Sequence, residues 1–298
     1  MRVLVTGGAG NIGREVVALL KQRGDETVVF DRIANSDPNP VANLVGDITD
    51  RRLIETVLRE YGIEGVVHLA AILQFGCEQD PLRAIDVNVN GTVALLQAAL
   101  DAGVKRIVHA SSIAAYGTTE GELDERSAIQ RDVGMYGLTK LLAEALLSRA
   151  ARKHDIICRT VIFATVLSDR PVSSPGIAAA VAKIVGSAKG GDTLVGEVAA
   201  DERRHYVYYR DAARAAVAAL VVPETLDDTF HVAGDENSYV TFAELAGLIR
   251  EIRPDAGRVM FNGKSGHRGR VVTQRAQEQL GYQPAYTLRS ALQEILSS

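Results

Sequence analysis

The first thirteen residues constrain this chain more than any other stretch. An apolar run at residues 3–5 leads into Gly7, Gly10 and Gly13, and an amphipathic pattern begins at Ile12. This order predicts a strand, a tight turn and a helix whose N-terminus lies beside backbone without bulky side chains. Free N–H groups and the helix dipole favour an anion there, so the turn suits a pyrophosphate. Because a glycine triplet alone is a weak signal, the rest of the chain has to support this interpretation.

The rest of the chain alternates strand-like and helical segments. Apolar runs typical of strands lie at residues 27–30, 44–45, 66–69, 107–110, 156–163 and 229–234, and helical patterns lie at residues 50–61, 84–102, 135–154 and 211–222. This alternation predicts an α/β fold of the Rossmann type, a doubly wound parallel sheet with helices on both faces. Ligands then bind at the carboxyl ends of the strands.

Several helix ends carry local signals. Gly24, Gly62 and Gly103 each follow a helical pattern, where a glycine C-cap is common. Thr241 and Glu244 have the spacing of a capping box that opens a helix. After residue 235 the sequence predicts mainly short helices.

The second half of the chain predicts a second, smaller unit. The proline-bearing stretch at residues 167–176 has the composition of a loop that leaves the sheet. We therefore expect a dinucleotide-binding domain and a discontinuous C-terminal substrate-binding region. The predicted domain comprises residues 1–166, with 208–234 returning to it, and the predicted substrate-binding region comprises residues 167–207 and 235–298.

An acidic residue stands where the second strand is expected to end. Asp31 follows Gly13 by eighteen residues, a position from which a carboxylate accepts hydrogen bonds from ribose hydroxyls and repels a 2′-phosphate. Arg32 alone would suggest the phosphorylated cofactor, but Asp31 comes first, so the sequence favours NAD. Asp47 follows the next strand and can accept from the adenine amino group.

A tyrosine and a lysine suggest the chemistry. Tyr136 and Lys140 stand four apart on a predicted helix and so share one face. A free phenol titrates near pH ~10, but a nearby ammonium and a nicotinamide cation both favour its phenolate. Ser111 or Ser112, at the end of a strand, can hold the substrate oxygen. Tyr136 can then take the hydroxyl proton while C4 of NAD takes the hydride.

Taken in order, these pieces resemble an extended short-chain dehydrogenase/reductase of the NAD-dependent epimerase/dehydratase family. The resemblance covers residues 1–165, and its motifs are residues 6–13, Asp31, 46–48, 68–71, 88–92, 111–112 with 116–117, and Tyr136 with Lys140. Aligned on residues 116–117, it implies that Ser112 holds the substrate. It also implies that Tyr136 is the acid/base and that Lys140 binds the nicotinamide ribose and lowers the tyrosine pKa.

The resemblance also implies a set of cofactor-binding residues, in which Asn88 supports the site. The predicted set is Gly7, Gly10, Asn11, Ile12, Gly13, Asp31, Arg32, Asp47, Ile48, Leu69, Ala70, Ala71, Asn88, Tyr136 and Lys140. Dehydratases of the family carry an acidic pair that here falls on Ile113 and Ala114, so dehydration is disfavoured. The reactions that remain open are epimerisation and a net oxidation or reduction of the substrate.

The resemblance gives mixed signals about the substrate. Arg204 matches an arginine that grips the diphosphate of a nucleotide-sugar, and Arg268 lies near a second one. Against this, an asparagine usual in nucleotide-sugar enzymes falls on Ile162, and the C-terminal region is short. We expect a nucleotide-sugar 4-epimerase-like oxidoreductase. The alternatives are an NAD-dependent dehydrogenase of a free sugar acid, polyol or hydroxy acid, and a non-catalytic NAD-binding sensor.

Composition and local sequence features limit the binding partners and the cellular compartment of the protein. The net charge of −4 argues against a nucleic-acid surface. The chain begins directly with a strand, and its longest apolar stretch, residues 215–222, is too short to span a bilayer. Cys77 and Cys158 lack metal spacing and suggest a reducing compartment. His68 and His109 are expected in the core. We predict a cytoplasmic protein without a metal site.

Two predicted helices have apolar residues on more than one side. These are the patterns at residues 84–102 and 135–154, which include Leu96 and Leu142. In proteins of the family that the chain resembles, these helices form a four-helix interface between two subunits. The resemblance therefore implies a homodimer.

Overall fold

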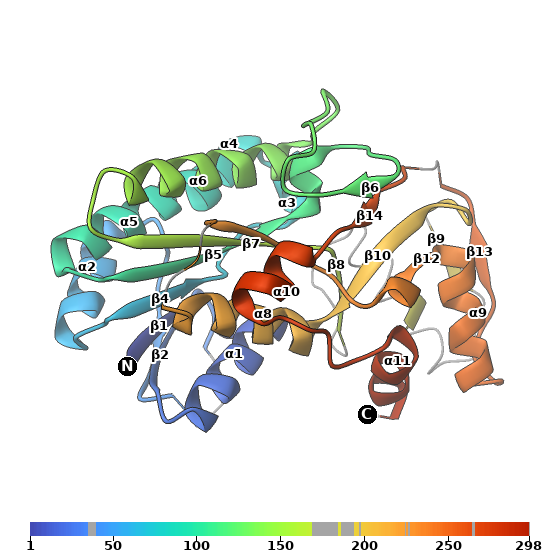
Figure 1. Ribbon diagram of the computed structural model, residues 1–298, viewed down its shortest axis with the longest axis horizontal. Helices are drawn as coiled ribbons and strands as arrows, with labels where there is room; N and C mark the ends of the chain where they lie inside the picture. Colours follow the sequence, from blue (N-terminus) through green and yellow to red (C-terminus); the bar gives the residue numbers. More distant parts are fainter. Residues whose placement is uncertain are drawn as a thin grey trace.

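A computed structural model describes residues 1–34, 40–168, 184–185, 194–196, 198–223, 225, 227–263 and 266–297. At its centre lies a parallel sheet in the order β11-β7-β5-β4-β1-β2-β3 (Figure 1). Its strands are β1 (Arg2–Thr6), β2 (Glu26–Asp31), β3 (Ala42–Val45), β4 (Gly65–His68), β5 (Arg106–Ser112), β7 (Ile157–Phe163) and β11 (Thr229–Val232). The predicted Rossmann-type fold is confirmed.

The strand order reverses beside β1. From β1 the chain moves outward through β2 and β3, and it then returns to place β4 on the other side of β1. Thr6 therefore pairs with Phe30 on one side and His68 on the other. The crevice above such a reversal is where open α/β sheets bind ligands.

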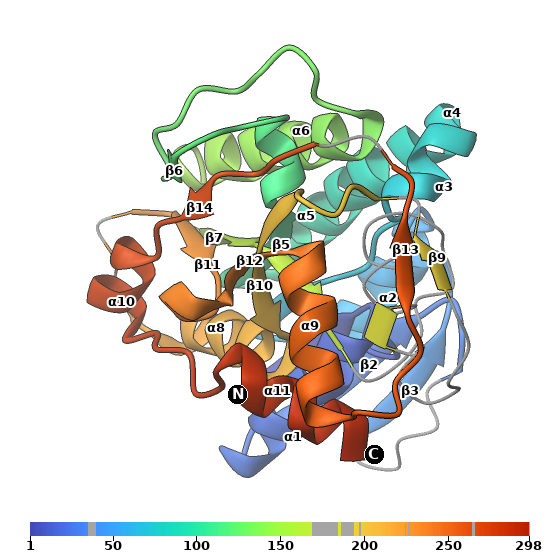
Figure 2. The same ribbon diagram turned by 90° about the vertical axis from the view of Figure 1, so that its right-hand side faces the viewer.

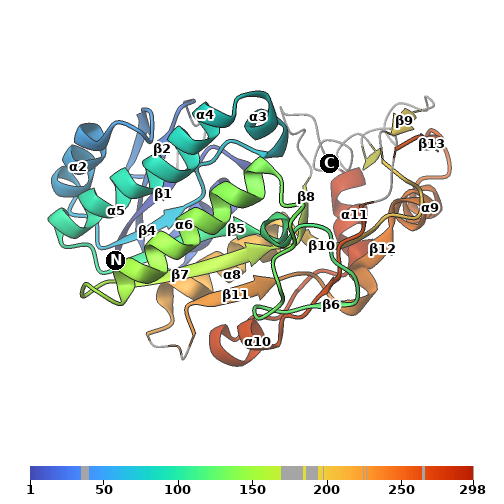
Figure 3. The same cartoon turned by 90° about the horizontal axis from the view of Figure 1, so that it is seen from above.

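Helices cover both faces of the sheet (Figures 1 and 3). One apolar core lies under α1 (Asn11–Gln22) and α8 (Tyr209–Val221). A second lies under α2 (Arg51–Glu60), α5 (Gly91–Ala102) and α6 (Met135–Ala151). Because both faces are buried, the central strands are nearly continuous apolar runs. None of the described helices is long and apolar enough to cross a membrane.

The helix-end signals are confirmed. Gly24, Gly62 and Gly103 adopt φ values of 83°, 57° and 74°, in the left-handed region. Both hydrogen bonds of the Thr241 capping box are present. The helix predicted at residues 84–102 consists of three consecutive segments: α4 (Pro81–Ala84), a π-helix (Ile85–Asn90) and α5. Before it comes the short helix α3 (Gln74–Gln79).

The C-terminal part lies at the carboxyl ends of the central strands (Figures 1 and 2). It has its own apolar core, built around α9 (Phe242–Ile252) and α11 (Leu288–Ser297). Its strands are β8 (Thr165–Leu167), β9 (Leu194–Gly196), β10 (Arg203–Tyr208), β12 (Tyr239–Thr241), β13 (Val259–Phe261) and β14 (Arg270–Val271), together with β6 (Glu122–Leu123) from the first half of the chain. A further helix is α10 (Gln274–Leu280).

The expectation of mainly helices after residue 235 was incomplete. The strands β12, β13 and β14 also lie there, and each has only two or three residues. Strands this short have no alternation of polar and apolar residues long enough to show in the sequence. Most of the loop predicted at residues 167–176 lies outside the described residues.

Candidate active site

A cavity of about 760 Å³ opens at the carboxyl ends of the central strands, beside the β1/β4 reversal. It brings together residues from both halves of the chain. The predicted site residues that line it are Gly7, Gly10, Asn11, Ile12, Gly13, Asp31, Arg32, Asp47, Ile48, Leu69, Ala70, Ala71, Ser112, Tyr136, Lys140, Arg204 and Arg268. Of the predicted residues, only Asn88 is not among the described residues that line the cavity.

The glycine turn allows three segments of backbone to meet. Gly7 has a φ of +70°, and a Cβ there would lie 2.7 Å from the Ala70 nitrogen. A Cβ on Gly13 would lie 2.4 Å from the Gly7 oxygen. Gly10, the residue before α1, makes no side-chain cap. The first amides of α1 therefore remain available to an anion in the cavity.

Two carboxylates lie at the far end of the cavity from Tyr136. Asp31, at the end of β2, accepts hydrogen bonds from the backbone N–H groups of Ala9 and Ile33 at 3.0 and 3.3 Å. Asp47 bonds to Thr49 and, at 2.5 Å, to Arg83. The Thr49 backbone N–H, with help from Arg83, holds the pKa of Asp47 below its usual value. Sequence reasoning missed Arg83 because no motif marks it.

Asn88 supports a wall of the cavity and is not itself among the described lining residues. Its side chain is buried within the protein. The amide donates to the Ile72 carbonyl and to Thr139 Oγ1, each at 3.0 Å, and its oxygen accepts from the Ile72 N–H at 2.8 Å. Asn88 thus ties the loop after β4 to α6.

Tyr136 and Lys140 come from α6 and meet the end of β5. The Lys140 ammonium donates to the Ala110 carbonyl at 2.8 Å and lies 5.7 Å from the centre of the Tyr136 ring. Burial lowers the pKa of Lys140 to about 8. Burial also raises the pKa of Tyr136 above its usual value. The lowering of the tyrosine pKa by Lys140 that the resemblance implies stays a prediction, and burial of the phenol opposes it.

The two serines at the end of β5 have different partners. Ser111 donates its hydroxyl to Glu144 of α6 and is 3% exposed. Ser112 remains partly exposed, and its Oγ accepts the Ala114 N–H at 3.2 Å, which caps a 3-10 helix (Ile113–Tyr116). Both serines line the cavity with Tyr136, and Ser112 is the more exposed of the two.

This chain has no carboxylate at the two positions where dehydratases of the family carry acidic residues. Ile113 and Ala114 both line the cavity next to Ser112. Among the described lining residues the carboxylates are Asp31 and Asp47, on the opposite side of the reversal. No described lining carboxylate is placed to expel a hydroxyl.

The two predicted arginines meet in the cavity, but one is already paired. Arg204 is 6% exposed and forms an ion pair with Glu202, whose other oxygen accepts the Gly266 N–H at 3.2 Å. The Nε of Arg204 has no hydrogen-bond partner among the described residues. Burial, followed by the charge of Arg204, lowers the pKa of Arg268 to about 10. No sequence motif marked Glu202.

Ile162 does not face the cavity. It is 1% exposed and packs in the core of the sheet. The cavity is lined instead by Phe163, Ala164 and Thr165, just beyond it. The departure from the nucleotide-sugar pattern therefore lies inside the sheet.

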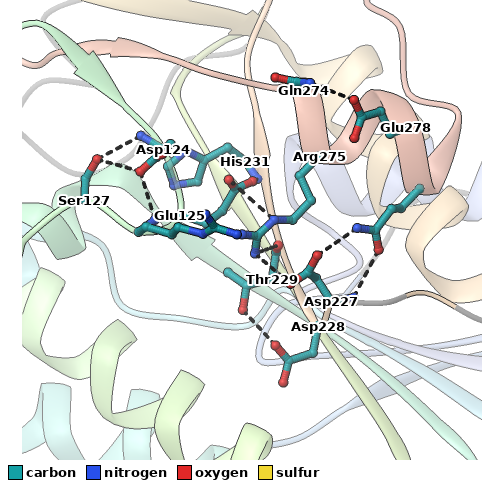
Figure 4. A network of polar contacts seen from close by, with 12 residues as sticks. Asp124, Glu125, Ser127, Asp227, Asp228, Thr229, His231, Gln274, Arg275 and Glu278 are labelled. Carbon is teal, nitrogen blue, oxygen red and sulfur yellow. Dashed lines mark hydrogen bonds and ion pairs between the residues drawn. The ribbon is translucent and has the colours of Figure 1, made fainter.

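A polar network joins the loop after β6 to β11 and α10 (Figure 4). Buried His231 bonds to the Tyr116 hydroxyl at 3.0 Å, and its backbone N–H donates to Glu125 at 2.8 Å. Arg275 lies between Glu125 and Asp227, at 3.7 and 3.4 Å. Tyr116 ends the 3-10 helix that Ser112 caps, so the network fixes this helix against β11 and α10.

Buried histidines predict acid sensitivity. Burial lowers the pKa values of His68, His109, His205 and His231, that of His68 to about 3. Below pH ~6.5 the unfolded chain therefore binds more protons than the folded one, and stability falls by about 1.4 kcal/mol per pH unit for each such histidine. We expect urea midpoints to drop between pH 7 and pH 5. His68→Asn should make the urea midpoint depend less on pH. A change of midpoint with pH equal to that of the wild type would contradict this prediction.

Comparisons with known proteins agree with this geometry. Residues 3–233 match the model of a family described as the NAD dependent epimerase/dehydratase family. A UDP-glucose 4-epimerase of Rhizobium meliloti is 36% identical over 149 residues, 49% of this chain and 45% of that protein. A UDP-glucose 4-epimerase of Streptomyces lividans is 35% identical over 161 residues, which are 52% of this chain and 49% of that protein. The chain thus spans about half the length of the curated relatives it matches.

Solved structures match over the whole length. The UDP-glucose 4-epimerase of Thermus thermophilus in complex with NAD superposes with a TM-score of 0.83 at 26% identity, covering 100% of this chain and 98% of that one. The L-threonine dehydrogenase of Phytophthora infestans superposes with a TM-score of 0.89 at 24% identity, with coverage of 100% and 98%. This second likeness shows the fold alone.

Proposed function

Because this chain belongs to the NAD-dependent epimerase/dehydratase family, we propose that it transfers a hydride between NAD and a carbinol carbon of a sugar substrate, as a nucleotide-sugar 4-epimerase does. The observation that carries the proposal is the cavity itself, where Ser112, Tyr136 and Lys140 face the same space as the glycine turn. The same three side chains argue against a non-catalytic sensor, which needs no acid/base group.

The residues beside the β1/β4 reversal suit NAD. The uncapped start of α1 suits the pyrophosphate, and Asp31 suits the adenine ribose. Arg32, Ile48, Leu69 and the small residues after β4 complete the proposed binding surface. When bound, NAD supplies the hydride acceptor and a positive nicotinamide ring.

We assign the proton steps to three side chains. Ser112 holds the substrate oxygen by a hydrogen bond, and Tyr136 takes the hydroxyl proton as the carbon loses its hydride. Because burial raises the pKa of Tyr136, its phenolate forms only with positive charge close by. The Lys140 ammonium, fixed by the Ala110 carbonyl, contributes this charge from the protein.

Asp31 should make the enzyme prefer NAD over NADP. The carboxylate at the end of β2 would repel a 2′-phosphate, so we expect NAD to raise the melting temperature well more than NADP does. Asp31→Ser should reduce the difference between the melting-temperature increases caused by NAD and by NADP. Equal or reversed shifts with the wild-type protein would remove the role given to Asp31.

A second candidate substrate class is favoured by the Glu202 ion pair. Glu202 offsets the charge of Arg204, so the two arginines and this carboxylate together carry one positive charge rather than two. A free small acid, such as a sugar acid or hydroxy acid, needs only one positive charge. A diphosphate is better matched by two.

Substitution of Arg268 separates the two substrate classes. If a nucleotide-sugar is the substrate, Arg268→Ala should raise the KM of a UDP-sugar about tenfold or more by removing a charge-assisted contact. A thermal-shift screen should compare UDP-, dTDP- and GDP-sugars with free uronates, polyols and hydroxy acids. A response to free compounds alone would reject the nucleotide-sugar proposal in favour of the dehydrogenase.

We also propose a homodimer formed through α6. Leu138, Leu142 and Leu146 are four residues apart and are 45%, 50% and 39% exposed, so they form a stripe on the outer face of α6. An exposed apolar stripe of this kind suits a helix–helix interface. Leu142→Glu should convert a dimer to a monomer in light scattering, and a monomeric wild-type protein would contradict the proposal.

We further propose that the chain divides into two regions and that the protein is cytoplasmic. The apolar core around α9 and α11 supports a separate substrate-binding region at residues 167–207 and 235–298, with 1–166 and 208–234 binding NAD. Cys77 and Cys158 are both buried and free, which supports a reducing, cytoplasmic location.

A further inference from the structure

The proposed acid/base lies in the first turn of its helix, where helices fray most readily. α6 begins at Met135, and Tyr136 is its second residue. The residue before the helix is Gly134, which has no side chain to cap it, and the first turn of α6 carries no acidic residue. Because the N–H groups of a first turn have no partner within their own helix, an unaided start of α6 would hold Tyr136 loosely.

A carboxylate from another helix caps this start. Glu78 Oε1, from α3, accepts the backbone N–H of Met135 at 2.8 Å. The helix dipole also favours a negative charge at this end of α6. A Cβ on Gly134 would lie 2.8 Å from the same carboxylate oxygen, so Glu78 occupies the space that a capping side chain of α6 would need. Glu78 therefore takes the place of an N-cap residue.

The other side of the first turn is fixed by buried contacts. The Tyr136 carbonyl accepts the Thr139 hydroxyl at 2.8 Å, and the oxygen of this hydroxyl accepts from the Asn88 amide at 3.0 Å. The turn also packs so closely against the 3-10 helix that Gly137 has no room for a Cβ. These contacts hold the buried side of the turn, whereas Glu78 holds its exposed start.

We propose that Glu78 is a positioning residue for Tyr136: its carboxylate fixes the start of α6 and so keeps the phenol in place in the cavity. Neither the sequence motifs nor the proposed mechanism assigns Glu78 a role. The proposal rests on the proposed function, because the position of Tyr136 matters to turnover only if its phenol is the acid/base. The effect of Glu78 on the start of α6 can be measured without turnover.

The first test measures amide hydrogen exchange at the start of α6 by NMR, in the whole chain. The Leu138 N–H donates to the Gly134 carbonyl at 3.0 Å, which is the first helical hydrogen bond of α6. We expect Glu78→Ala to make the exchange of this N–H about fivefold faster, the effect of losing a typical N-cap. Glu78→Gln still offers an oxygen and should change the exchange less. Gln79→Ala, at the next residue of α3, which is also exposed, should leave it unchanged.

The second test measures turnover with NAD well below the unfolding temperature. In Glu78→Ala we expect kcat to fall about five- to tenfold, because small displacements of a reacting group are costly. The KM and the Kd for NAD should change little, since Glu78 is not among the described residues that line the cavity. Glu78→Gln should keep most of the wild-type kcat.

A substitution at Gly134 offers a rescue. Gly134 has φ −71° and ψ 170°, a conformation that other residues also adopt and that is usual for an N-cap. In Glu78→Ala the oxygen that would collide with a side chain at this position is gone. Gly134→Asp in that background can therefore cap α6 from within its own segment. It should restore kcat and slow the exchange of the Leu138 N–H.

Exchange of the Leu138 N–H at the wild-type rate in Glu78→Ala would overturn the proposal. Faster exchange together with a wild-type kcat would also overturn it, because Glu78 would then stabilise the helix without positioning Tyr136. If the wild-type protein binds NAD but turns over no substrate, the proposed function fails. The exchange rates then still decide whether Glu78 holds the start of α6.

Discussion

Replacing Tyr136 by phenylalanine is expected to lower kcat by about 10²–10⁴-fold, the usual contribution of a positioned acid/base. The change removes one hydroxyl from a ring that lines the cavity and faces the same space as Ser112. NAD binding should persist, because the glycine turn and Asp31 are untouched. Stopped-flow or steady-state turnover, together with NADH fluorescence titration, separates the two effects.

The matched control is Tyr61→Phe, which removes a phenol at the end of α2 on the far side of the fold. It should leave kcat and NAD binding at wild-type values. Turnover retained by Tyr136→Phe would show that another group moves the proton, and the proposed mechanism would then be wrong. Loss of NAD binding in the same variant would instead indicate a structural role for the phenol.

The second large effect is expected from Gly13→Ala. A Cβ at this position would lie 2.4 Å from the Gly7 oxygen and 2.6 Å from the Gly8 Cα, and both are backbone atoms that cannot turn aside. The helix start would have to move away from the turn, so the amides that suit a pyrophosphate would be displaced. We expect the Kd for NAD to rise at least about tenfold and stability to fall by about 1–3 kcal/mol.

Gly247→Ala is the control for this substitution. No atom lies within 4 Å of a Cβ at that position in α9. A helix-interior alanine is favoured over glycine by about 1 kcal/mol, so the control should be neutral or slightly stabilising and should bind NAD normally. Wild-type NAD affinity in Gly13→Ala, measured by isothermal titration, would rule out the proposed pyrophosphate site.

The polar side chains around the cavity show where sequence reasoning reached its limit. The alignment on residues 116–117 favours Ser112 over the adjacent Ser111, but it gives no sign that Ser111 bonds to Glu144 of α6. Arg204 was interpreted as a free cation, but it is buried in an ion pair with Glu202, two residues earlier in the chain. Asn88 reads as a site residue, but it bonds to Ile72 and so lies behind the cavity wall.

The sequence by itself determined the Rossmann-type sheet, the glycine turn and the Tyr136/Lys140 pair, because each depends on spacing within one segment. Periodicity, glycine conformation and helical spacing are local properties that survive without knowledge of the fold. The tertiary structure alone decided the polar partners of the site residues: Ser111 bonds to Glu144, Arg204 is buried against Glu202, and Asn88 bonds to Ile72. These depend on how deeply each side chain is buried and on which polar group the fold leaves within reach of it, and neither has a pattern along the chain.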